Sequence, residues 1–238
     1  MTPSEIRTLR AALSTLTVRE GGSRVLAVWR HVVRGLTPEG LDHVEAARVA
    51  RLRRRDDQDR YLTAHHLARR IVGEWLGSPP GEVLFDRTCA RCGAQHGAPR
   101  VVGPAAASGR PVPTVSLTHS GHVVGVALAS GGPVGIDVEE PWPDDGEARL
   151  AGMVRAPADE VQPDLRRLWV SKEAVLKAAG VGLTVAMSEL ALRDGSALLD
   201  SQRWWYAAVD APDGYAASVA GAWPPPSWIQ SLRLDPST

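Results

Sequence analysis

The sequence predicts an α+β fold, in which helices and strands are mixed without regular alternation. Three observations lead to this prediction. A long stretch, Glu39 to Leu76, has helical spacing of apolar residues; three short strand-like runs follow one another between Val115 and Glu139; and a second helical stretch, Asp164 to Ala179, precedes further strands. A doubly wound parallel sheet would instead alternate strand and helix throughout.

The first helical stretch carries an apolar stripe of period 3.6 and ends at clear breaker residues. Gly77-Ser78-Pro79-Pro80-Gly81 should terminate it, and the Gly-, Ala- and Pro-rich stretch from Val101 to Pro113 should be a loop. The stripe consists of Tyr61, Leu62, His65, Leu67 or Ala68, Ile71, Val72 and Trp75.

The strand-like runs are joined by tight turns, which predicts an antiparallel meander. Val115 to His119 and Val123 to Ala129 flank Ser120-Gly121-His122, and Val134 to Glu139 follows a Gly-Gly-Pro turn.

The rest of the chain should be a loop, a helix, strands and an extended tail. Asp164 is a suitable N-cap for the second helix, and Gly180 should end it. In chain order the expected elements are a loop over Pro141–Pro163, the helix, strands at Leu190–Leu192, Arg203–Val209 and Tyr215–Ala222, and an extended segment beyond Pro224.

Composition limits the classes of protein to consider. The 238 residues suffice for one large domain or two small ones, with 27 basic and 27 acidic residues in balance. Neither nucleic acid nor a membrane surface is therefore indicated as a bulk partner. Charged residues interrupt the stretch from Met1 to Arg30, and no apolar run is long enough for a bilayer span, so a cytoplasmic protein is expected.

The two cysteines of the chain, Cys89 and Cys92, lie close to His96 and resemble half of a zinc site. Structural zinc almost always has four protein ligands. The remaining ligand would have to come from a distant histidine (His31, His43, His65 or His66) brought near by folding. We therefore expect a reduced pair of loop cysteines, with a zinc-stabilised interaction module as an alternative.

Two carboxylates share one face of the strand from Val134 to Glu139. Because strand side chains alternate, Asp137 and Glu139 should face one way, about 7 Å apart, and Ile136 and Val138 the other. Oxygen ligands suit Mg²⁺ or Mn²⁺ better than zinc. A simple solvated strand face is the alternative.

Both lysines of the chain lie in the second helical stretch. Lys172 and Lys177 are the only lysines of the chain, and Glu173 lies between them, four residues before Lys177. Such a pair alone would be a surface contact that contributes roughly 0.2–0.5 kcal/mol. Its coincidence with the only lysines favours a site where carboxylates hold a metal and lysines neutralise phosphate.

A hydroxyl and an imidazole end the strand that should lie beside Asp137. Thr118 and His119 there are suited to bind a further phosphate, although a strand-end histidine in a turn is an equal alternative.

Together these residues resemble the Sfp-type 4′-phosphopantetheinyl transferases. Three motifs of that family occur in order: Thr118-His119-Ser120, Gly135-Ile136-Asp137-Val138-Glu139, and the stretch from Trp169 to Lys177 that reads W-x-x-K-E-A-x-x-K. The resemblance extends to Asp59-Arg60-Tyr61 and covers most of Glu45 to Leu183.

The resemblance implies a fold and a set of ligands. The fold would be a monomeric pseudo-dimer of two similar halves, residues 1–130 and 131–238, each an antiparallel sheet packed with a long helix, with coenzyme A in the cleft between them. Asp137, Glu139 and Glu173 would bind the metal. The further implied contacts are Lys172 and Lys177 with phosphates, Thr118 and His119 with the nucleotide end, Arg60 in the adenine-nucleotide pocket, and Arg48 or Arg51 at a basic position upstream.

One departure concerns the 3′-phosphate of coenzyme A. The family often has Gly-Lys-Pro before the Thr-His-Ser turn, whereas this chain has Gly97-Ala98-Pro99-Arg100. That contact would then be lost, or would pass to Arg100 or to Arg110.

The implied reaction transfers phosphopantetheine from coenzyme A to a serine of an acyl or peptidyl carrier protein, for fatty acid, polyketide or nonribosomal peptide synthesis. The serine hydroxyl would attack the β-phosphorus and release 3′,5′-ADP, with Glu173 as base and with Lys177 and Asp137 as further catalytic groups. A non-catalytic coenzyme A-binding scaffold is the alternative function.

Overall fold

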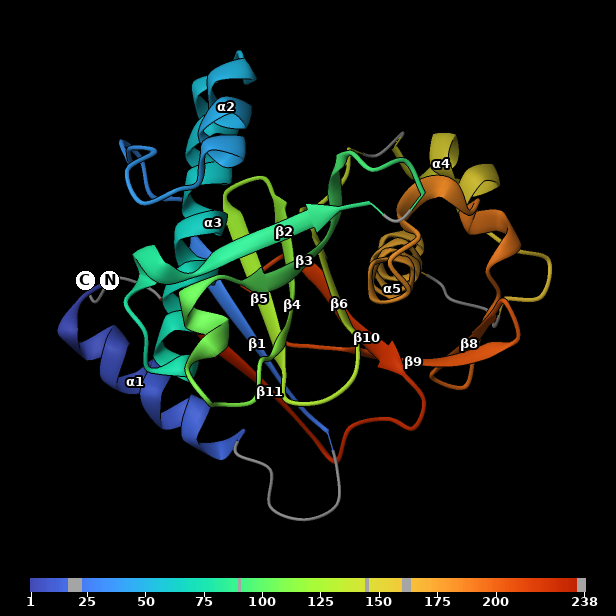
Figure 1. The fold of residues 1–238 in the computed structure, drawn as a ribbon. Helices are drawn as coiled ribbons and strands as arrows, with labels where there is room; N and C mark the ends of the chain where they lie inside the picture. The colour runs from blue at the N-terminus through green and yellow to red at the C-terminus, as the bar shows by residue number, and fades with distance from the viewer. Residues whose placement is uncertain (17–22, 90, 144–145, 160–163, 235–238) are drawn as a thin grey trace.

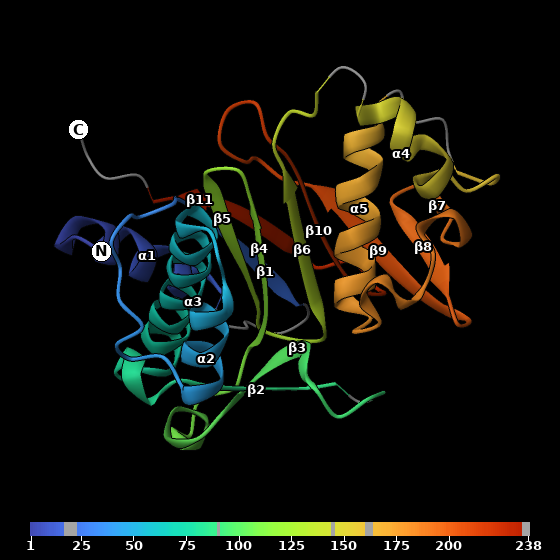
Figure 2. The same cartoon turned by 90° about the horizontal axis from the view of Figure 1, so that it is seen from above.

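The computed structural model describes residues 1–16, 23–89, 91–143, 146–159 and 164–234. Two β-sheets lie between two long helices, α3 (Arg55–Leu76) and α5 (Leu165–Ala178), which flank the strands in Figures 1 and 2. The predicted α+β class is therefore confirmed. The helices of the described part are all too short or too polar to cross a bilayer.

The first sheet has the strand order β11-β1-β5-β4. Strand β1 (Arg24–His31) is parallel to β11 (Trp228–Arg233) and antiparallel to β5 (Val123–Ala129), which forms a hairpin with β4 (Thr114–Ser120). Helices α1 (Pro3–Thr15) and α3 cover one face of this sheet, and their apolar residues share a core with alternate residues of β1 and β5.

The second sheet has the order β6-β10-β9-β8-β7, with antiparallel neighbours. Helix α5 packs across one face, where Leu168 and Val175 meet Trp204 and Ala220. Helix α4 (Gly146–Val154) lies beside α5. The strands are β6 (Val134–Glu139), β7 (Leu192–Arg193), β8 (Ser196–Leu199), β9 (Gln202–Ala208) and β10 (Ala216–Ala222).

The inner faces of the two sheets pack on each other. Val25 and Trp29 of β1 share a buried core with Ile136 of β6 and Val219 of β10. Each sheet thus has a helix on its outer face and the other sheet on its inner face, which leaves α3 and α5 on opposite sides of the junction (Figure 2).

Side-chain hydroxyls connect the sheets where β4 runs beside β6. Three alternate residues of β4 accept hydrogen bonds from backbone N–H groups of the neighbouring segment, in place of a backbone ladder. The acceptors Ser116, Thr118 and Ser120 bind the N–H groups of Ile136, Val138 and Glu140 at 3.3, 3.2 and 3.1 Å.

The prediction of one helix over Glu39–Leu76 was wrong, because two helices occupy this stretch. Helix α2 (His43–Arg51) begins with a capping box of Asp42 and Glu45, and the chain leaves the helical conformation at Leu52. The Gln58 side-chain amide donates to the Leu52 carbonyl at 2.8 Å, which satisfies this oxygen outside a helix. The end of α3 at left-handed Gly77 (φ 73°) is as predicted.

The meander was correct only for its first two strands. Strands β4 and β5 form the predicted hairpin, but β6 pairs with β10 through its backbone and belongs to the other sheet. Helix α5, capped by Asp164, is confirmed, as are strands at β9 and β10.

Several elements were not predicted. Helix α4 lies inside the stretch expected to be a loop, of which residues 144–145 and 160–163 are outside the described part. The segment beyond Pro224, expected to be extended, contains strand β11. The strand expected at Leu190–Leu192 overlaps the short strand β7 at Leu192 alone. The elements that no pattern indicated are α1, β1, β8 and the two-stranded ribbon of β2 (Leu84–Thr88) and β3 (Gln95–Val102).

Candidate active site

Two carboxylates of β6 face α5 at the junction of the sheets. Ile136 and Val138 point into the core between the sheets, so Asp137 and Glu139 lie on the opposite face, as the alternation predicted. Asp137 is buried and Glu139 is half-buried.

A glycine brings α5 against this face. A Cβ atom built on Gly135 would lie 2.0 Å from the carbonyl oxygen of Ala174 and 2.6 Å from the backbone nitrogen of Ala178. Only a glycine therefore permits this helix–strand approach. The close packing directs Glu173 and Lys177, one helical turn apart, at the carboxylates of β6.

The two oxygens of the Asp137 carboxylate differ in their hydrogen bonding. Its Oδ1 accepts hydrogen bonds from the Lys177 ammonium at 2.6 Å and from the Thr118 hydroxyl at 2.9 Å. Its Oδ2 is buried and has no hydrogen-bond partner within the described residues. A buried carboxylate oxygen without a partner is costly, and a bound cation would satisfy it.

The other two carboxyls are destabilised in their charged form. Burial raises the pKa of Glu139; the Ser120 hydroxyl, 2.9 Å from its Oε2, opposes this, and the charge of Asp137 adds to it. Burial also raises the pKa of Glu173, opposed by Lys177 and increased by the charges of Asp137 and Glu139. The three carboxylates thus repel one another in a partly buried environment, where solvent screens their charges only in part.

These residues fit a hard divalent cation. They offer only oxygen ligands, one of them unpartnered, and their mutual repulsion would be relieved by positive charge. Their oxygens do not all lie within 4.8 Å of one another; within the described chain, only Cys89, Cys92 and His96 form a set of three candidate ligands that close together.

His119 and Arg60 lie near the same site. Burial, followed by the positive charges of Lys177 and Arg60, lowers the pKa of His119, although the residue keeps an exposed surface. Arg60, on α3, donates to the Gly121 carbonyl at 3.0 Å in the turn after β4 and pairs with Asp57. Thr118 is buried with its hydroxyl engaged by Asp137 and Val138, which suits positioning of Asp137 better than ligand contact.

Lys172 lies away from these groups. Its side chain is 0% exposed, and its ammonium donates to the Val154 carbonyl at 2.6 Å, to Asp159 at 2.7 Å and to the Met187 carbonyl at 2.9 Å. Lys172 therefore joins α5 to the end of α4 and to the segment before β7. This placement argues against the phosphate contact expected of it.

The two other expected basic residues are also apart from the carboxylates. Arg48 is exposed on α2, and Arg100 is exposed on β3, where it pairs with Asp86. Among the described residues, no hydrogen bond or ion pair joins either arginine to Asp137, Glu139 or Glu173.

Two functional features escaped the sequence argument. Gly135 was read only as part of a motif, although it sets the distance between α5 and β6. Ser120 binds Glu139 and was not considered as a site residue. The spacing of Ser116, Thr118 and Ser120 by two positions in a strand was the available signal for a polar edge at β4.

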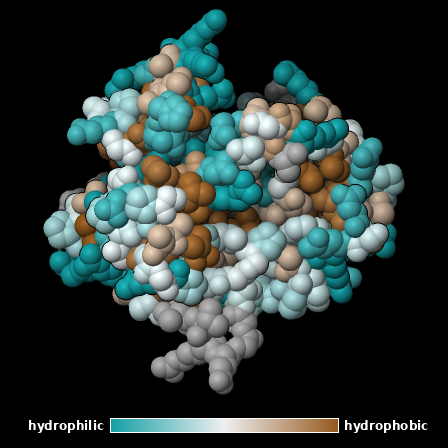
Figure 3. Space-filling view, viewed as in Figure 1, coloured by the Kyte–Doolittle hydropathy of each residue, from teal (hydrophilic) through white to brown (hydrophobic). Residues whose placement is uncertain are grey.

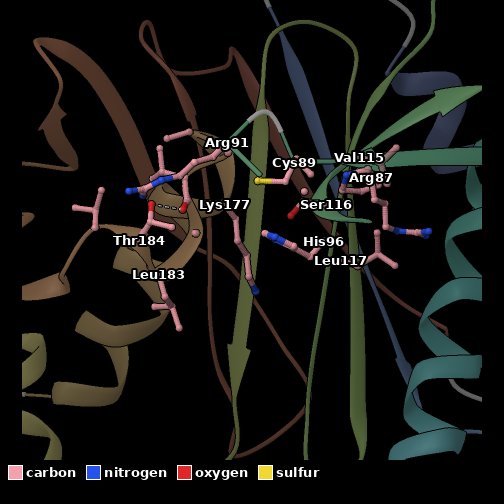
Figure 4. Close-up of a pocket in the computed structure, with 18 of the residues that line it drawn as sticks. Arg87, Cys89, Arg91, His96, Val115, Ser116, Leu117, Lys177, Leu183 and Thr184 are labelled. Atoms are coloured by element: carbon pink, nitrogen blue, oxygen red, sulfur yellow. Dashed lines mark hydrogen bonds between the residues drawn. The ribbon is translucent and has the colours of Figure 1, made fainter. Parts of the chain in front are cut away.

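A cavity of about 1150 Å³ adjoins the site. Lys177 lies on its α5 side, and Ser116 of β4 and the ribbon residues Cys89 and His96 lie across from it (Figure 4). Figure 3 shows apolar side chains among polar ones on the face that carries this ribbon.

Comparison of the sequence with known proteins finds relatives named as transferases. No family model matches the chain. It is 29% identical over 156 residues to 4′-phosphopantetheinyl transferase psf-1 of Bacillus pumilus, and 28% identical over 204 residues to 4′-phosphopantetheinyl transferase HetI of a Nostoc species. A Synechocystis protein provisionally given the same family name is 28% identical over 160 residues.

By sequence the chain is similar to proteins named 4′-phosphopantetheinyl transferases, at 28–29% identity. The match to the transferase HetI covers 79% of this chain and 82% of HetI. The matches to the Synechocystis and Bacillus transferases span 61% and 60% of those proteins and 63% and 60% of this chain.

Proposed function

We propose that this protein transfers the 4′-phosphopantetheine group of coenzyme A to a serine of an acyl or peptidyl carrier protein and releases 3′,5′-ADP. The observation that carries the proposal is the carboxylate cluster beside Lys177, in which Asp137 is buried with a free Oδ2. A structural ion pair would not need two further carboxyls with raised pKa values beside it.

Asp137, Glu139 and Glu173 would hold Mg²⁺, or Mn²⁺ in its place. When bound, the ion would supply positive charge against the pyrophosphate of coenzyme A. The further groups of the site belong to the chain. Lys177 is 28% exposed and reaches the edge of the cavity, where it would bind and orient a phosphate oxygen.

Glu173 would accept the proton of the carrier serine. Its raised pKa brings it closer to neutral pH, which favours proton transfer by a carboxylate. The serine oxygen forms a bond to the β-phosphorus, the bond from this phosphorus to the leaving 3′,5′-ADP oxygen breaks, and the serine proton goes to Glu173. His119 and Arg60, whose charges interact at the end of β4, would bind the nucleotide end.

The fold is proposed to be a pseudo-dimer of residues 1–130 and 131–238, in which β11 of the second range crosses over to complete the first sheet beside β1. Helix α3 packs on β4 and β5, and helix α5 packs on β6 and β10, so each part joins a long helix to an antiparallel pair. A monomer would then contain the whole site at the junction of its own halves.

Intact mass spectrometry of an apo carrier protein tests the reaction. Incubation with this protein, coenzyme A and Mg²⁺ should add the mass of one phosphopantetheine group, and EDTA or replacement of the carrier serine by alanine should prevent it. Coenzyme A binding without mass gain across acyl and peptidyl carriers would favour the non-catalytic scaffold. Glu173→Gln should remove turnover and leave nucleotide binding largely intact; a near-normal rate would exclude its role as base.

A further inference from the structure

Cys89, Cys92 and His96 converge at the tip of the β2–β3 ribbon. The Cys92 sulfur lies 3.0 Å from His96 Nε2, and the three candidate ligand atoms all lie within 4.8 Å of one another. Two sulfurs on one zinc ion lie about 3.8 Å apart, given zinc–sulfur bonds of about 2.3 Å in a tetrahedron. All three ligand atoms thus lie within the 4.8 Å that a shared metal ion allows, and the Cys92–His96 pair, at hydrogen-bond distance without an ion, would separate slightly to bind one.

The backbone of the ribbon tip favours this arrangement. Gly93 donates to the Cys89 carbonyl and Cys89 donates to the Ala94 carbonyl, each at 2.8 Å, and Gly93 has a positive φ of 73°. Backbone hydrogen bonding by Arg91 and then Cys92 lowers the pKa of the Cys89 thiol. Such donors stabilise a thiolate, which is the form that binds metal.

Neighbouring contacts hold His96 on the same side as the cysteines. A Cβ atom on Gly97 would lie 3.0 Å from the Arg87 carbonyl oxygen and 3.2 Å from Cys89 Cα, so a glycine lets the two strands approach closely here. The Gln95 side chain donates to the Thr88 hydroxyl at 2.8 Å across the ribbon. The ligand geometry thus has support outside the three ligands themselves.

We propose that Cys89, Cys92 and His96 bind one Zn²⁺ ion, whose fourth position opens to the cavity shared with Lys177. Two sulfurs and one imidazole are ligands for zinc and not for Mg²⁺, which separates this site from the carboxylate cluster. Binding converts the two thiols to thiolates and releases their protons to solvent.

The open position follows from where the site lies. Cys89, Cys92 and His96 line the same cavity as Lys177, and Figure 4 shows Cys89 and His96 on its ribbon side. Three protein ligands leave one zinc position for water or for a ligand that enters the cavity. The metal also joins both strands of the ribbon and so fixes one wall of the cavity.

Metal content and affinity test the site without reference to transferase activity. Protein purified with zinc and passed through a chelating resin should retain about one zinc per chain, the stoichiometry of a single three-ligand site. Cys92→Ser and His96→Gln should each weaken zinc binding at least about tenfold, since even the loss of an outer-shell partner can do so. His43→Gln, which changes an exposed histidine on α2, is the matched control and should retain full metal content.

Cobalt substitution tests the ligand set in the unaltered chain. Co²⁺ should produce an intense sulfur-to-metal charge-transfer band and tetrahedral visible bands, and a small added thiol should shift the visible bands by entering the fourth position. Wild-type protein that stays metal-free after zinc addition, equal metal content in Cys92→Ser, or a Cys89–Cys92 disulfide in reduced preparations would overturn the site. Cobalt bands that do not respond to thiol would overturn the open position.

Discussion

Replacement of Lys172 by methionine tests whether this lysine stabilises the fold or binds a phosphate of coenzyme A. Methionine keeps a long side chain but removes the ammonium, which donates three hydrogen bonds inside the protein. Asp159 would then keep its charge at 6% side-chain exposure, and the carbonyls of Val154 and Met187 would lose a donor. Burial lowers the pKa of Lys172, and the hydrogen bond and charge of Asp159 oppose this. The charged form of Lys172 is therefore stabilised by Asp159.

The expected loss of stability is large. Removal of one partner of a buried ion pair costs about 3–5 kcal/mol, and neither side chain is exposed enough for solvent to reduce this much. For a chain of this size each kcal/mol corresponds to roughly 2–4 °C, so Tm should fall by roughly 6–20 °C. Asp159→Asn, added to Lys172→Met, should recover part of the loss because it removes the unpaired charge; the recovery is partial because the Ala156 and Leu192 N–H groups bind different oxygens of Asp159 and asparagine keeps only one acceptor oxygen.

The only other lysine of the chain is the matched comparison. Lys177→Met changes a side chain that is 28% exposed at the site, so it should weaken coenzyme A binding more than it weakens the fold. Urea unfolding and calorimetric titration with coenzyme A, both well below Tm, would measure the two effects. Unchanged stability together with lost coenzyme A binding in Lys172→Met would refute the structural role.

Three further results are expected. Gly135→Ala should destabilise the fold by about 1–3 kcal/mol or more, because its Cβ meets the α5 backbone, whereas Gly152→Ala, with open space around it, should not; equal urea midpoints would contradict the contact. Since the raised pKa of Glu173 favours its protonated form, its contribution to stability is present below the unfolded value of about 4.3 and is lost as pH rises through the folded pKa. Glu173→Gln should therefore have a higher Tm than the parent at neutral pH and an equal Tm in acid, and a constant difference would refute this. Mg²⁺ should raise the Tm of the parent but hardly that of Asp137→Asn, and equal shifts would exclude Asp137 as a ligand.

The part of the site that depends on local geometry could be predicted from the sequence. Alternation along β6 places Asp137 and Glu139 on one face, and a four-residue spacing on α5 places Glu173 beside Lys177. The same geometry could have corrected the assignment of Lys172. Five residues along a helix correspond to a rotation of about 140°, so the two lysines do not point the same way.

The unpredicted parts depend on contacts between distant segments. Strand β1 lies between β5 and β11, so its pairing needs residues about 100 and 200 positions away, which no local pattern reports. The turn before β6 has hairpin chemistry, yet β10 supplies the backbone partner of β6. Helix α4 is short and follows a proline-rich segment, so its packing on α5 stabilises it more than its own propensity.

The hydroxyls of β4 join the architecture of the junction to the chemistry of the site. Thr118 accepts from the Val138 N–H and donates to Asp137 Oδ1, and Ser120 accepts from the Glu140 N–H and donates to Glu139. Each hydroxyl can do both because it has one donor and two acceptor positions. The contacts that hold the sheets together therefore also fix both carboxylates of β6. With Oδ1 of Asp137 occupied by Thr118 and Lys177, its unpartnered Oδ2 is the oxygen left for a cation.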